Sequence, residues 1–140
     1  MSETKRMAVA GVAGRMGRQL VRAVIEAGHE IAGGTEIPES PHRDTDIARL
    51  AGFGQSIGER PVTDPVQAAT EAHVWIDFTA PAATLAALDG LKHTSVQAVV
   101  IGTTGFNARE EAQIAAASTH FAIVKAGNFS LGVNLLTAVT

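Results

Sequence analysis

A glycine-rich turn near the amino terminus has the residue types and spacing of an anion-binding site. Gly11, Gly14 and Gly17 follow the apolar residues 7–10 and open a segment with helical periodicity. Glycines allow positive φ and a close approach of backbone N–H groups to a phosphate, and the amino end of a helix adds about half a positive charge. The turn therefore predicts pyrophosphate binding, and a plain tight turn without a ligand is the alternative interpretation.

An acidic residue further along the chain supports the first interpretation. Glu36 stands at the end of the next apolar run, 25 residues after Gly11. A carboxylate in this position can accept hydrogen bonds from the hydroxyls of an adenosine ribose. The order of strand, glycine turn, helix, strand and acid predicts dinucleotide or nucleotide binding.

Two later strand ends also carry polar residues. Residues 102–106, Gly-Thr-Thr-Gly-Phe, supply backbone donors and two hydroxyls, and we expect them to line a nicotinamide and its ribose. Residues 126–130, Ala-Gly-Asn-Phe-Ser, offer an amide and carbonyls suited to a carboxamide. Asp77 is interpreted as a strand-end residue bonded to nearby backbone amides, and Lys125 as a solvated or snorkelling lysine. The 5 histidines lack the spacing typical of metal ligands, so no metal site is predicted.

Alternating apolar runs and helical segments predict the elements that position these residues. We expect strands over residues 7–10, 31–35, 74–78, 98–101 and 121–124. We expect helices over residues 16–25 and 65–72 and a third helix from residue 81 onward, with Leu85, Leu88 and Leu91 on one side. A fourth helix is expected from a capping box at Asn107 and Glu110 to about residue 118. This alternation predicts a single α/β domain with a doubly wound parallel sheet. Such sheets bind ligands at the carboxyl ends of their strands.

Residues 37–61 interrupt the alternation with several prolines, glycines and charges. We interpret them as a long surface excursion with one helical turn near Asp46–Leu50. Loops of this length are often functional or mobile.

Length and composition exclude several classes of protein. The 140 residues suit one domain, and the net charge of −3, from 11 basic and 14 acidic residues, argues against a nucleic-acid partner. The absence of cysteine excludes disulfides and thiol chemistry. No apolar run approaches the ~18 residues of a membrane span. The polar amino terminus does not resemble a signal peptide, so a cytoplasmic setting is expected.

Four blocks of the sequence resemble, in order, those of 4-hydroxy-tetrahydrodipicolinate reductase, also called dihydrodipicolinate reductase. The blocks are residues 8–18 (AVAGVAGRMGR), 76–79 (IDFT), 100–106 (VIGTTGF) and 128–134 (NFSLGVN). They extend along the whole chain and together are specific to that family. The resemblance implies a Rossmann-like fold and an NAD(P)H-dependent reductase of the diaminopimelate route to lysine, acting on a cyclic dicarboxylate by hydride transfer.

The resemblance also implies which residues contact the cofactor. They are Gly11, Val12, Ala13, Gly14, Arg15, Met16, Glu36, Gly102, Thr103, Thr104, Ala126, Gly127, Asn128 and Phe129. In the family, a second domain holds the catalytic His and Lys, the substrate-binding basic residues and the tetramer interface, so no catalytic residue is assigned here. We therefore expect residues 1–130 to form the dinucleotide-binding domain and residues 131–140 to begin a helix toward a missing second domain. The chain is expected to be inactive alone.

Two positions depart from the family pattern. Ile37 stands where members often carry Arg after the ribose-binding Glu, and Ala80 stands where many carry a basic residue. Both bases would help to hold a 2′-phosphate, so their absence favours NADH over NADPH. Arg43 or Arg15 could compensate in part, which leaves dual use open.

Two other functions compete with this interpretation. One is a non-catalytic module that senses NADH or binds coenzyme A, although Glu36 suits a free 2′-hydroxyl and would be awkward beside the 3′-phosphate of coenzyme A. The other is the cofactor domain of a different amino-acid or sugar dehydrogenase. The glycine turn and Glu36 fit that alternative equally well, and only the blocks at 100–106 and 128–134 separate the two.

Overall fold

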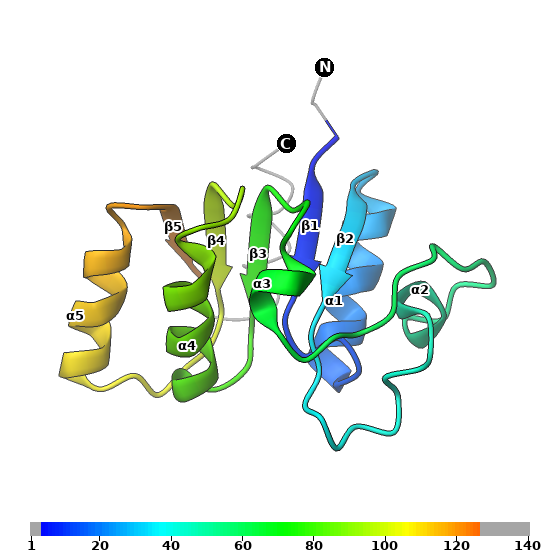
Figure 1. Ribbon diagram of the computed structural model, residues 1–140, viewed down its shortest axis with the longest axis horizontal. Coiled ribbons are helices and arrows are strands. Elements are labelled where there is room, and N and C mark those ends of the chain that lie inside the picture. Colours follow the sequence, from blue (N-terminus) through cyan, green and yellow to red (C-terminus); the bar gives the residue numbers. More distant parts are fainter. Residues whose placement is uncertain (1–3, 127–140) are drawn as a thin grey trace.

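A parallel sheet of five strands forms the centre of the molecule (Figure 1). The computed structural model describes residues 4–126. Its strands are β1 (Arg6–Val9), β2 (Glu30–Gly34), β3 (Val74–Asp77), β4 (Ala98–Ile101) and β5 (Ala122–Lys125). They are ordered β2-β1-β3-β4-β5, and each neighbouring pair is parallel. The α/β, Rossmann-like fold class predicted from the sequence is confirmed.

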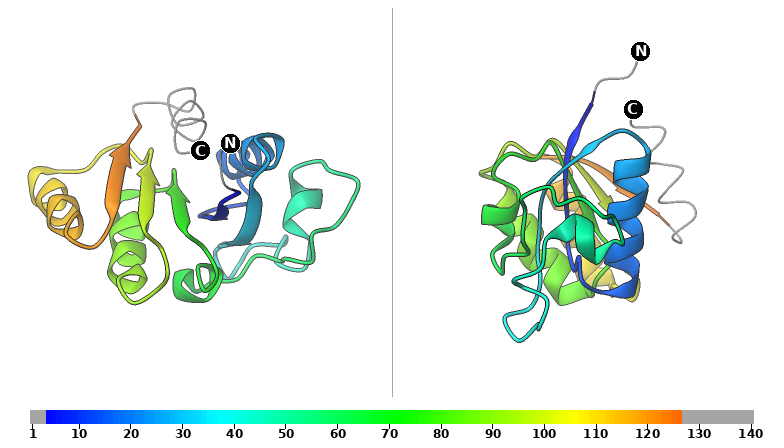
Figure 2. Two further views of the ribbon diagram at one scale, coloured as in Figure 1. Left: turned by 90° about the horizontal axis from the view of Figure 1, so that it is seen from above. Right: turned by 90° about the vertical axis from the view of Figure 1, so that its right-hand side faces the viewer.

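Helices cover both faces of this sheet. They are α1 (Arg15–Glu26), α2 (Ile47–Leu50), α3 (Pro65–Ala68), α4 (Pro81–Leu91) and α5 (Ala108–Ala117). Figure 2 shows α1 on one face and α3, α4 and α5 on the other. The strand order reverses between β1 and β3, and in such sheets a crevice opens at the carboxyl ends of those strands.

Local sequence signals explain where the helices begin and end. The buried positions of α1, which include Leu20, Val21 and Val24, recur at the spacing of a helical face. Gly28 follows α1 with a φ of 86°, a left-handed conformation that glycine adopts readily. At α5, Asn107 accepts a hydrogen bond from the Glu110 N–H, and the Glu110 side chain accepts one from the Asn107 N–H. The predicted capping box is therefore confirmed.

The helix expected over residues 65–72 is shorter than predicted. It begins at Pro65 after an Asp64 cap, as expected, but ends at Ala68. The Thr70 hydroxyl donates to the carbonyls of Val66 and Gln67 over 3.1 and 3.0 Å. Such back-bonding from a threonine competes with the backbone donors that would continue the helix.

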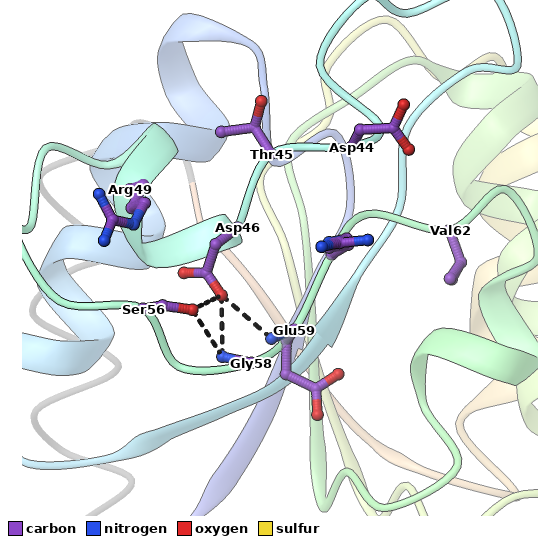
Figure 3. Close-up of a pocket in the computed structure, with 9 residues that line it drawn as sticks. Asp44, Thr45, Asp46, Arg49, Ser56, Gly58, Glu59 and Val62 are labelled. Atoms are coloured by element: carbon purple, nitrogen blue, oxygen red, sulfur yellow. Dashed lines mark hydrogen bonds between the residues drawn. The ribbon is translucent and has the colours of Figure 1, made fainter.

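The excursion over residues 37–61 is organised by Asp46, a buried residue at the amino end of α2 (Figure 3). Its carboxylate accepts from the backbone N–H groups of Ala48, Ile57, Gly58 and Glu59 and from the Ser56 hydroxyl. A bridge between Thr35 and Val62 then returns the chain beside β2. The predicted helical turn near Asp46–Leu50 is confirmed as α2.

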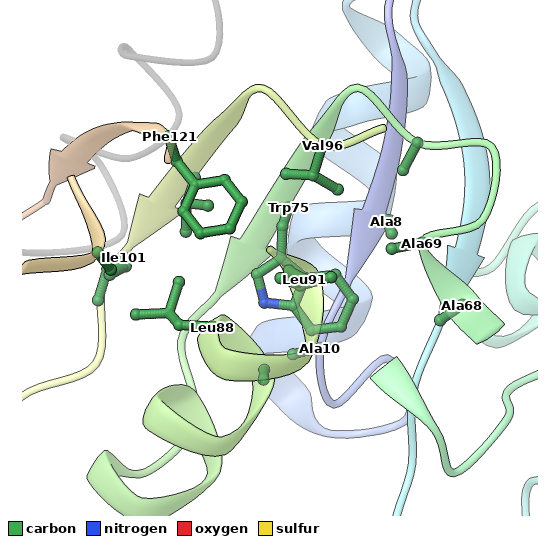
Figure 4. Packing of buried hydrophobic residues seen from close by; sticks show 14 of the residues in the cluster. Ala8, Ala10, Ala68, Ala69, Trp75, Leu88, Leu91, Val96, Ile101 and Phe121 are labelled. Carbon is green, nitrogen blue, oxygen red and sulfur yellow. The ribbon is translucent and has the colours of Figure 1, made fainter. Parts of the chain in front are cut away.

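Two hydrophobic clusters pack against the sheet. One contains Trp75, Leu88 and Leu91 and joins the sheet to α3, α4 and α5 (Figure 4). The other contains Leu20, Val24 and residues of β1 and β3 on the α1 side. Full burial of a leucine contributes about 1.5–3 kcal/mol, so the helices are fixed to the sheet mainly through these side chains.

The ends of the chain lie outside this description. The helix predicted over residues 131–140, and with it the predicted domain boundary at 130, lies outside the described residues. Within residues 4–126, none of the helices has the length and apolar character needed to cross a bilayer.

Candidate cofactor-binding site

The glycine turn between β1 and α1 is bonded to the residue that follows β2. Gly11 has a φ of 66°, which a side chain would strain. Its N–H donates to the Thr35 hydroxyl over 3.3 Å, and the Val12 N–H donates to the Thr35 carbonyl over 3.0 Å. The Val12 side chain is fully buried in the core. The turn therefore has a defined position at the carboxyl end of the sheet.

Gly14 and Gly17 lack side chains for different reasons. A Cβ atom on Gly17 would lie 1.9 Å from the Gly11 carbonyl oxygen, so the fold itself requires glycine there. Gly14 is exposed, has an ordinary φ of −73°, and its Cβ would meet only the Gly11 oxygen at 3.5 Å. The packing of the chain does not demand glycine at position 14, and the bare backbone leaves space for a ligand to approach.

The first turn of α1 presents unpaired donors beside that space. Gly14 is the N-cap and makes no side-chain cap hydrogen bond. Among residues 4–126, none accepts a hydrogen bond from the N–H groups of Arg15 or Met16. Arg15 is exposed and Met16 is half-buried against the α1-side cluster. Unpaired amides at the positive end of a helix form a site for an anion such as pyrophosphate.

Glu36 is held next to the glycine turn. Its Oε2 accepts from the Ala13 N–H over 2.8 Å, and its Oε1 accepts from the Ile37 N–H over 3.2 Å. A carboxylate oxygen can accept more than one hydrogen bond, so each oxygen keeps acceptor capacity. Two amides thus orient the half-buried carboxylate, and its remaining lone pairs suit a pair of hydroxyls.

A cavity of about 490 Å³ runs from the glycine turn to the amino end of α4. Gly11, Glu36 and Asp77 lie along one side, and alanines of α4, Ala83 and Ala87, lie along the other. Ile37, which is 62% exposed, and Ala80 also line it. Its apolar walls, with the two acids Glu36 and Asp77, suit a flat base and a ribose rather than a second phosphate.

The residues after β3 and β4 form a buried polar cluster. Thr103 is 6% exposed, and its hydroxyl accepts from the Thr79 N–H over 3.0 Å and lies 2.8 Å from the Thr84 hydroxyl. Thr104 is exposed. A Cβ on Gly102 would lie 2.1 Å from the Phe78 ring, so packing requires glycine there. Of the two predicted ligand hydroxyls, the structure leaves that of Thr104 facing outward.

The end of β5 lies beside this loop. Ala126 is buried, and its N–H donates to the Ile101 carbonyl over 2.8 Å. Lys125 is not simply solvated, because its Nζ lies 2.6 Å from the Glu111 carboxylate and 5.6 Å from the centre of the Phe106 ring. A cavity of about 420 Å³ separates these residues from Thr104. The predicted contacts Gly127, Asn128 and Phe129 lie outside the described residues.

Sequence reasoning missed Arg18 as part of this site. Its Nε donates to the Ala13 carbonyl over 2.7 Å, and its Nη2 lies 3.5 Å from His42 Nε2. Ala13 therefore binds Glu36 through its N–H group and Arg18 through its carbonyl oxygen. The available signal was its place four residues after the N-cap, one helical turn from Gly14.

A larger cavity, of about 690 Å³, lies in the excursion. Its walls mix the acids Asp44 and Glu59 with Arg49 and Arg60. The backbone donors at its floor already bind Asp46: burial would raise the pKa of that carboxyl, but hydrogen bonds from Ser56 and the neighbouring amides outweigh burial and lower it. The amides of Gly58 and Glu59 in this cavity are therefore occupied by Asp46, unlike those at the start of α1.

Comparisons with known proteins show which family and which fold the chain is similar to. A family model described as "Dihydrodipicolinate reductase, N-terminus" matches residues 5–129. The 4-hydroxy-tetrahydrodipicolinate reductase of Parvibaculum lavamentivorans is 45% identical over 145 residues, covering 99% of this chain and 51% of that protein. That of Sinorhizobium fredii is 48% identical over 143 residues, covering 100% and 52%.

A solved structure has the same fold. The dipicolinate-bound dihydrodipicolinate reductase from Paenisporosarcina sp. TG-14 matches with a TM-score of 0.68 at 21% identity, covering 92% of this chain and 49% of that one. The chain spans about half the length of the curated relatives it matches.

Proposed function

The chain belongs to the dihydrodipicolinate reductase family, as its amino-terminal, nucleotide-binding part, and from this premise we propose that it binds NADH in preference to NADPH. The bound cofactor serves a reductase that converts 4-hydroxy-tetrahydrodipicolinate to tetrahydrodipicolinate. One observation carries the proposal. The backbone N–H groups of Arg15 and Met16, at the start of α1, have no acceptor within residues 4–126, and the carboxylate of Glu36 is oriented by the glycine turn that precedes them.

The residues of the turn fit a dinucleotide pyrophosphate. The N–H groups of Arg15 and Met16 donate to its oxygens, and the helix dipole of α1 favours its negative charge. Gly14 lets the pyrophosphate reach those donors, because no side chain covers them. When bound, the cofactor supplies the hydride that the reaction needs.

The cavity at Glu36 fits the adenosine half. Glu36 accepts hydrogen bonds from both ribose hydroxyls, and the Ala13 N–H holds it in position to do so. A 2′-phosphate at this place would meet the carboxylate and the apolar side chains of Ile37 and Ala80. NADPH therefore binds more weakly, and Arg15 and Arg43 are the exposed cations that permit its use.

The carboxyl ends of β4 and β5 receive the nicotinamide half. Gly102, Thr103, Thr104 and Ala126 present backbone groups at this edge, and Gly127, Asn128 and Phe129 complete the contacts. The cyclic dicarboxylate substrate, the catalytic residues and a homotetramer interface belong to the part of the family's length that this chain does not cover. The chain alone binds cofactor without turnover, and the reductase acts in the cytoplasm within lysine biosynthesis.

Calorimetric titration of the 140-residue chain with NADH and then NADPH, at fixed salt, tests the proposal. We expect saturable binding of both, with the tighter dissociation constant for NADH. Equal or tighter binding of NADPH would contradict the argument from Ile37 and Ala80 while leaving the cofactor site intact. Binding of neither would contradict the proposed function, and coenzyme A would be titrated next.

A further inference from the structure

Arg18 is a charged residue of α1 that no part of the proposed function uses. It is half-buried, and its Nε donates to the Ala13 carbonyl over 2.7 Å. Among residues 4–126, Arg18 forms no ion pair with an acid. An arginine side chain can only donate hydrogen bonds, and this one donates to a main-chain carbonyl in the glycine turn.

That carbonyl belongs to a peptide bond that is held at both ends. The N–H of the same peptide, that of Gly14, donates to the Gly11 carbonyl over 3.1 Å. The backbone N–H of Arg18 donates to the next carbonyl along, that of Gly14, over 3.0 Å. Because a peptide bond is planar, the hydrogen bonds at its two ends fix the orientation of the whole unit between Ala13 and Gly14.

This peptide connects the two parts of the proposed cofactor site. On its amino side, the Ala13 N–H donates to Glu36 Oε2 over 2.8 Å. On its carboxyl side, Gly14 is the N-cap of α1 and precedes the amides of Arg15 and Met16. The spacing between the acid for the ribose and the amides for the pyrophosphate therefore depends on the orientation of this peptide.

We propose that Arg18 is a positioning residue for cofactor binding, which fixes the spacing between the Glu36 carboxylate and the amides at the start of α1. This inference rests on the proposed function. Arg18 acts through the Ala13 carbonyl and not by contact with the cofactor. A ligand that spans both parts binds more tightly when their spacing is preset, because less conformational freedom is lost on binding.

A second arginine of α1 provides a matched control. The guanidinium of Arg18 also lies close to the excursion, with its Nη2 3.5 Å from His42 Nε2. Arg22, one helical turn further along α1, donates from its Nη1 to the Ala51 carbonyl over 3.0 Å. Both arginines thus bind main-chain carbonyls, but only the carbonyl bound by Arg18 belongs to the glycine turn.

Two uncharged substitutions separate the hydrogen bond from the charge. In Arg18→Gln the amide nitrogen lies as far along the side chain as Nε and still donates to the Ala13 carbonyl, whereas Arg18→Met has no donor. Glutamine and methionine are both good helix formers, so both chains should fold. In calorimetric titrations we expect Arg18→Met to bind NADH about tenfold more weakly than Arg18→Gln, a coupling usual within one hydrogen-bond network. A role of the charge alone would give both variants the same affinity.

The same pair in a Glu36→Ala background tests the spacing. Without the carboxylate, the spacing between the two parts of the site no longer affects the affinity for NADH. The difference between Arg18→Gln and Arg18→Met should then fall to about twofold or less. An undiminished difference would overturn the positioning role, because Arg18 would then act on the amides independently of Glu36.

The controls and outcomes separate the two proposals. Arg22→Gln and Arg22→Met should bind NADH alike, and a difference as large as that at position 18 would overturn the inference. Arg18→Ala also lacks a donor and replaces Arg18→Met if urea denaturation shows that the latter is unfolded. Equal NADH affinity of Arg18→Gln and the folded chain without a donor overturns the role of Arg18 and leaves the cofactor site standing. Failure of the wild-type chain to bind NADH overturns the proposed function itself.

Discussion

Two regions of this molecule are built around a buried carboxylate, and they differ in what they leave unpaired. In the excursion, Asp46 accepts hydrogen bonds from the amides of the segment that folds over it, including those of Gly58 and Glu59. At the strand ends, Asp77 accepts hydrogen bonds from an indole N–H, a peptide N–H and threonine hydroxyls. At the start of α1, by contrast, the amides of Arg15 and Met16 have no partner among residues 4–126.

The proposed cofactor site lies beside the smaller of the two cavities, because the contrast lies in the hydrogen-bond donors and not in the volume. The excursion holds the larger cavity, about 690 Å³ against about 490 Å³. The amides of Gly58 and Glu59 in its wall, however, already donate to Asp46, so a ligand would have to displace that carboxylate to reach them. At α1 the amides of Arg15 and Met16 have no acceptor within residues 4–126, and the helix dipole adds to them. Substitutions in each region should therefore affect different measured quantities.

The largest effect on stability is expected from Asp46→Ala. Removing the carboxylate leaves several buried or half-buried donors without a partner, which should lower the free energy of unfolding by about 3 kcal/mol. The affinity of the folded fraction for NADH should not change. Urea denaturation with and without NADH measures both quantities. A loss of affinity with unchanged stability would place the excursion in the cofactor site and break the contrast.

Gly14→Val should have the opposite effect. The branched side chain covers the amides of Arg15 and Met16, and NADH affinity should fall about a hundredfold, equivalent to about 2.7 kcal/mol. The fold should persist, because Gly14 has an ordinary φ and open space around it. Gly54→Val is the matched control in the excursion, since a Cβ there meets nothing within 4 Å. Normal NADH affinity in folded Gly14→Val would refute the glycine-turn site.

Glu36→Ala is expected to weaken NADH binding by about 2 kcal/mol, because a charged acceptor of two ribose hydroxyls is lost. NADPH binding should weaken less, since the lost carboxylate also repels a 2′-phosphate. Titrations of both cofactors measure the two changes, and the exposed Glu39→Ala supplies the control. An unchanged dissociation constant for NADH would remove Glu36 from the site.

The smallest expected effect is a change with pH in the free energy of unfolding that Asp46 contributes in the excursion. The hydrogen bonds to Asp46 hold its pKa below the ordinary value despite burial. A group with a lowered folded-state pKa stabilises the fold above its unfolded pKa, and this stabilisation is lost as the pH falls. The stability advantage of the wild type over Asp46→Asn should therefore shrink as the pH falls below about 4. Urea denaturation followed by circular dichroism measures the free energy of unfolding of both chains at each pH. A stability advantage of the wild type that stays constant down to pH 3 would contradict the role of the Asp46 carboxylate.

The sequence predicted the fold class and the strand-turn-helix context of the glycine turn because the signals there are local. The G-x-x-G-x-x-G turn, the apolar runs and the Asn107 capping box each depend on neighbouring residues. The order of the strands was not predicted from the sequence and comes from the structure. The exception was α3, where Thr70 bonds backward and ends the helix early.

The remaining features depend on contacts between distant residues. Asp46 binds amides 10 or more residues away, and Asp77 meets Thr103 across 26 residues. Lys125 likewise meets its partner Glu111 across 14 residues. No spacing rule in one sequence reports such pairs, so the polar clusters became visible only in the structure.

The most direct test of the contrast is nuclear magnetic resonance of the ¹⁵N-labelled chain titrated with NADH. The account predicts that the amide resonances of Arg15, Met16 and Ile37 shift and saturate together. The amides of Ile57, Gly58 and Glu59, which donate to Asp46, should stay in place. Shifts at residues 57–59 with none at Arg15 and Met16 would contradict the account and move the ligand to the excursion.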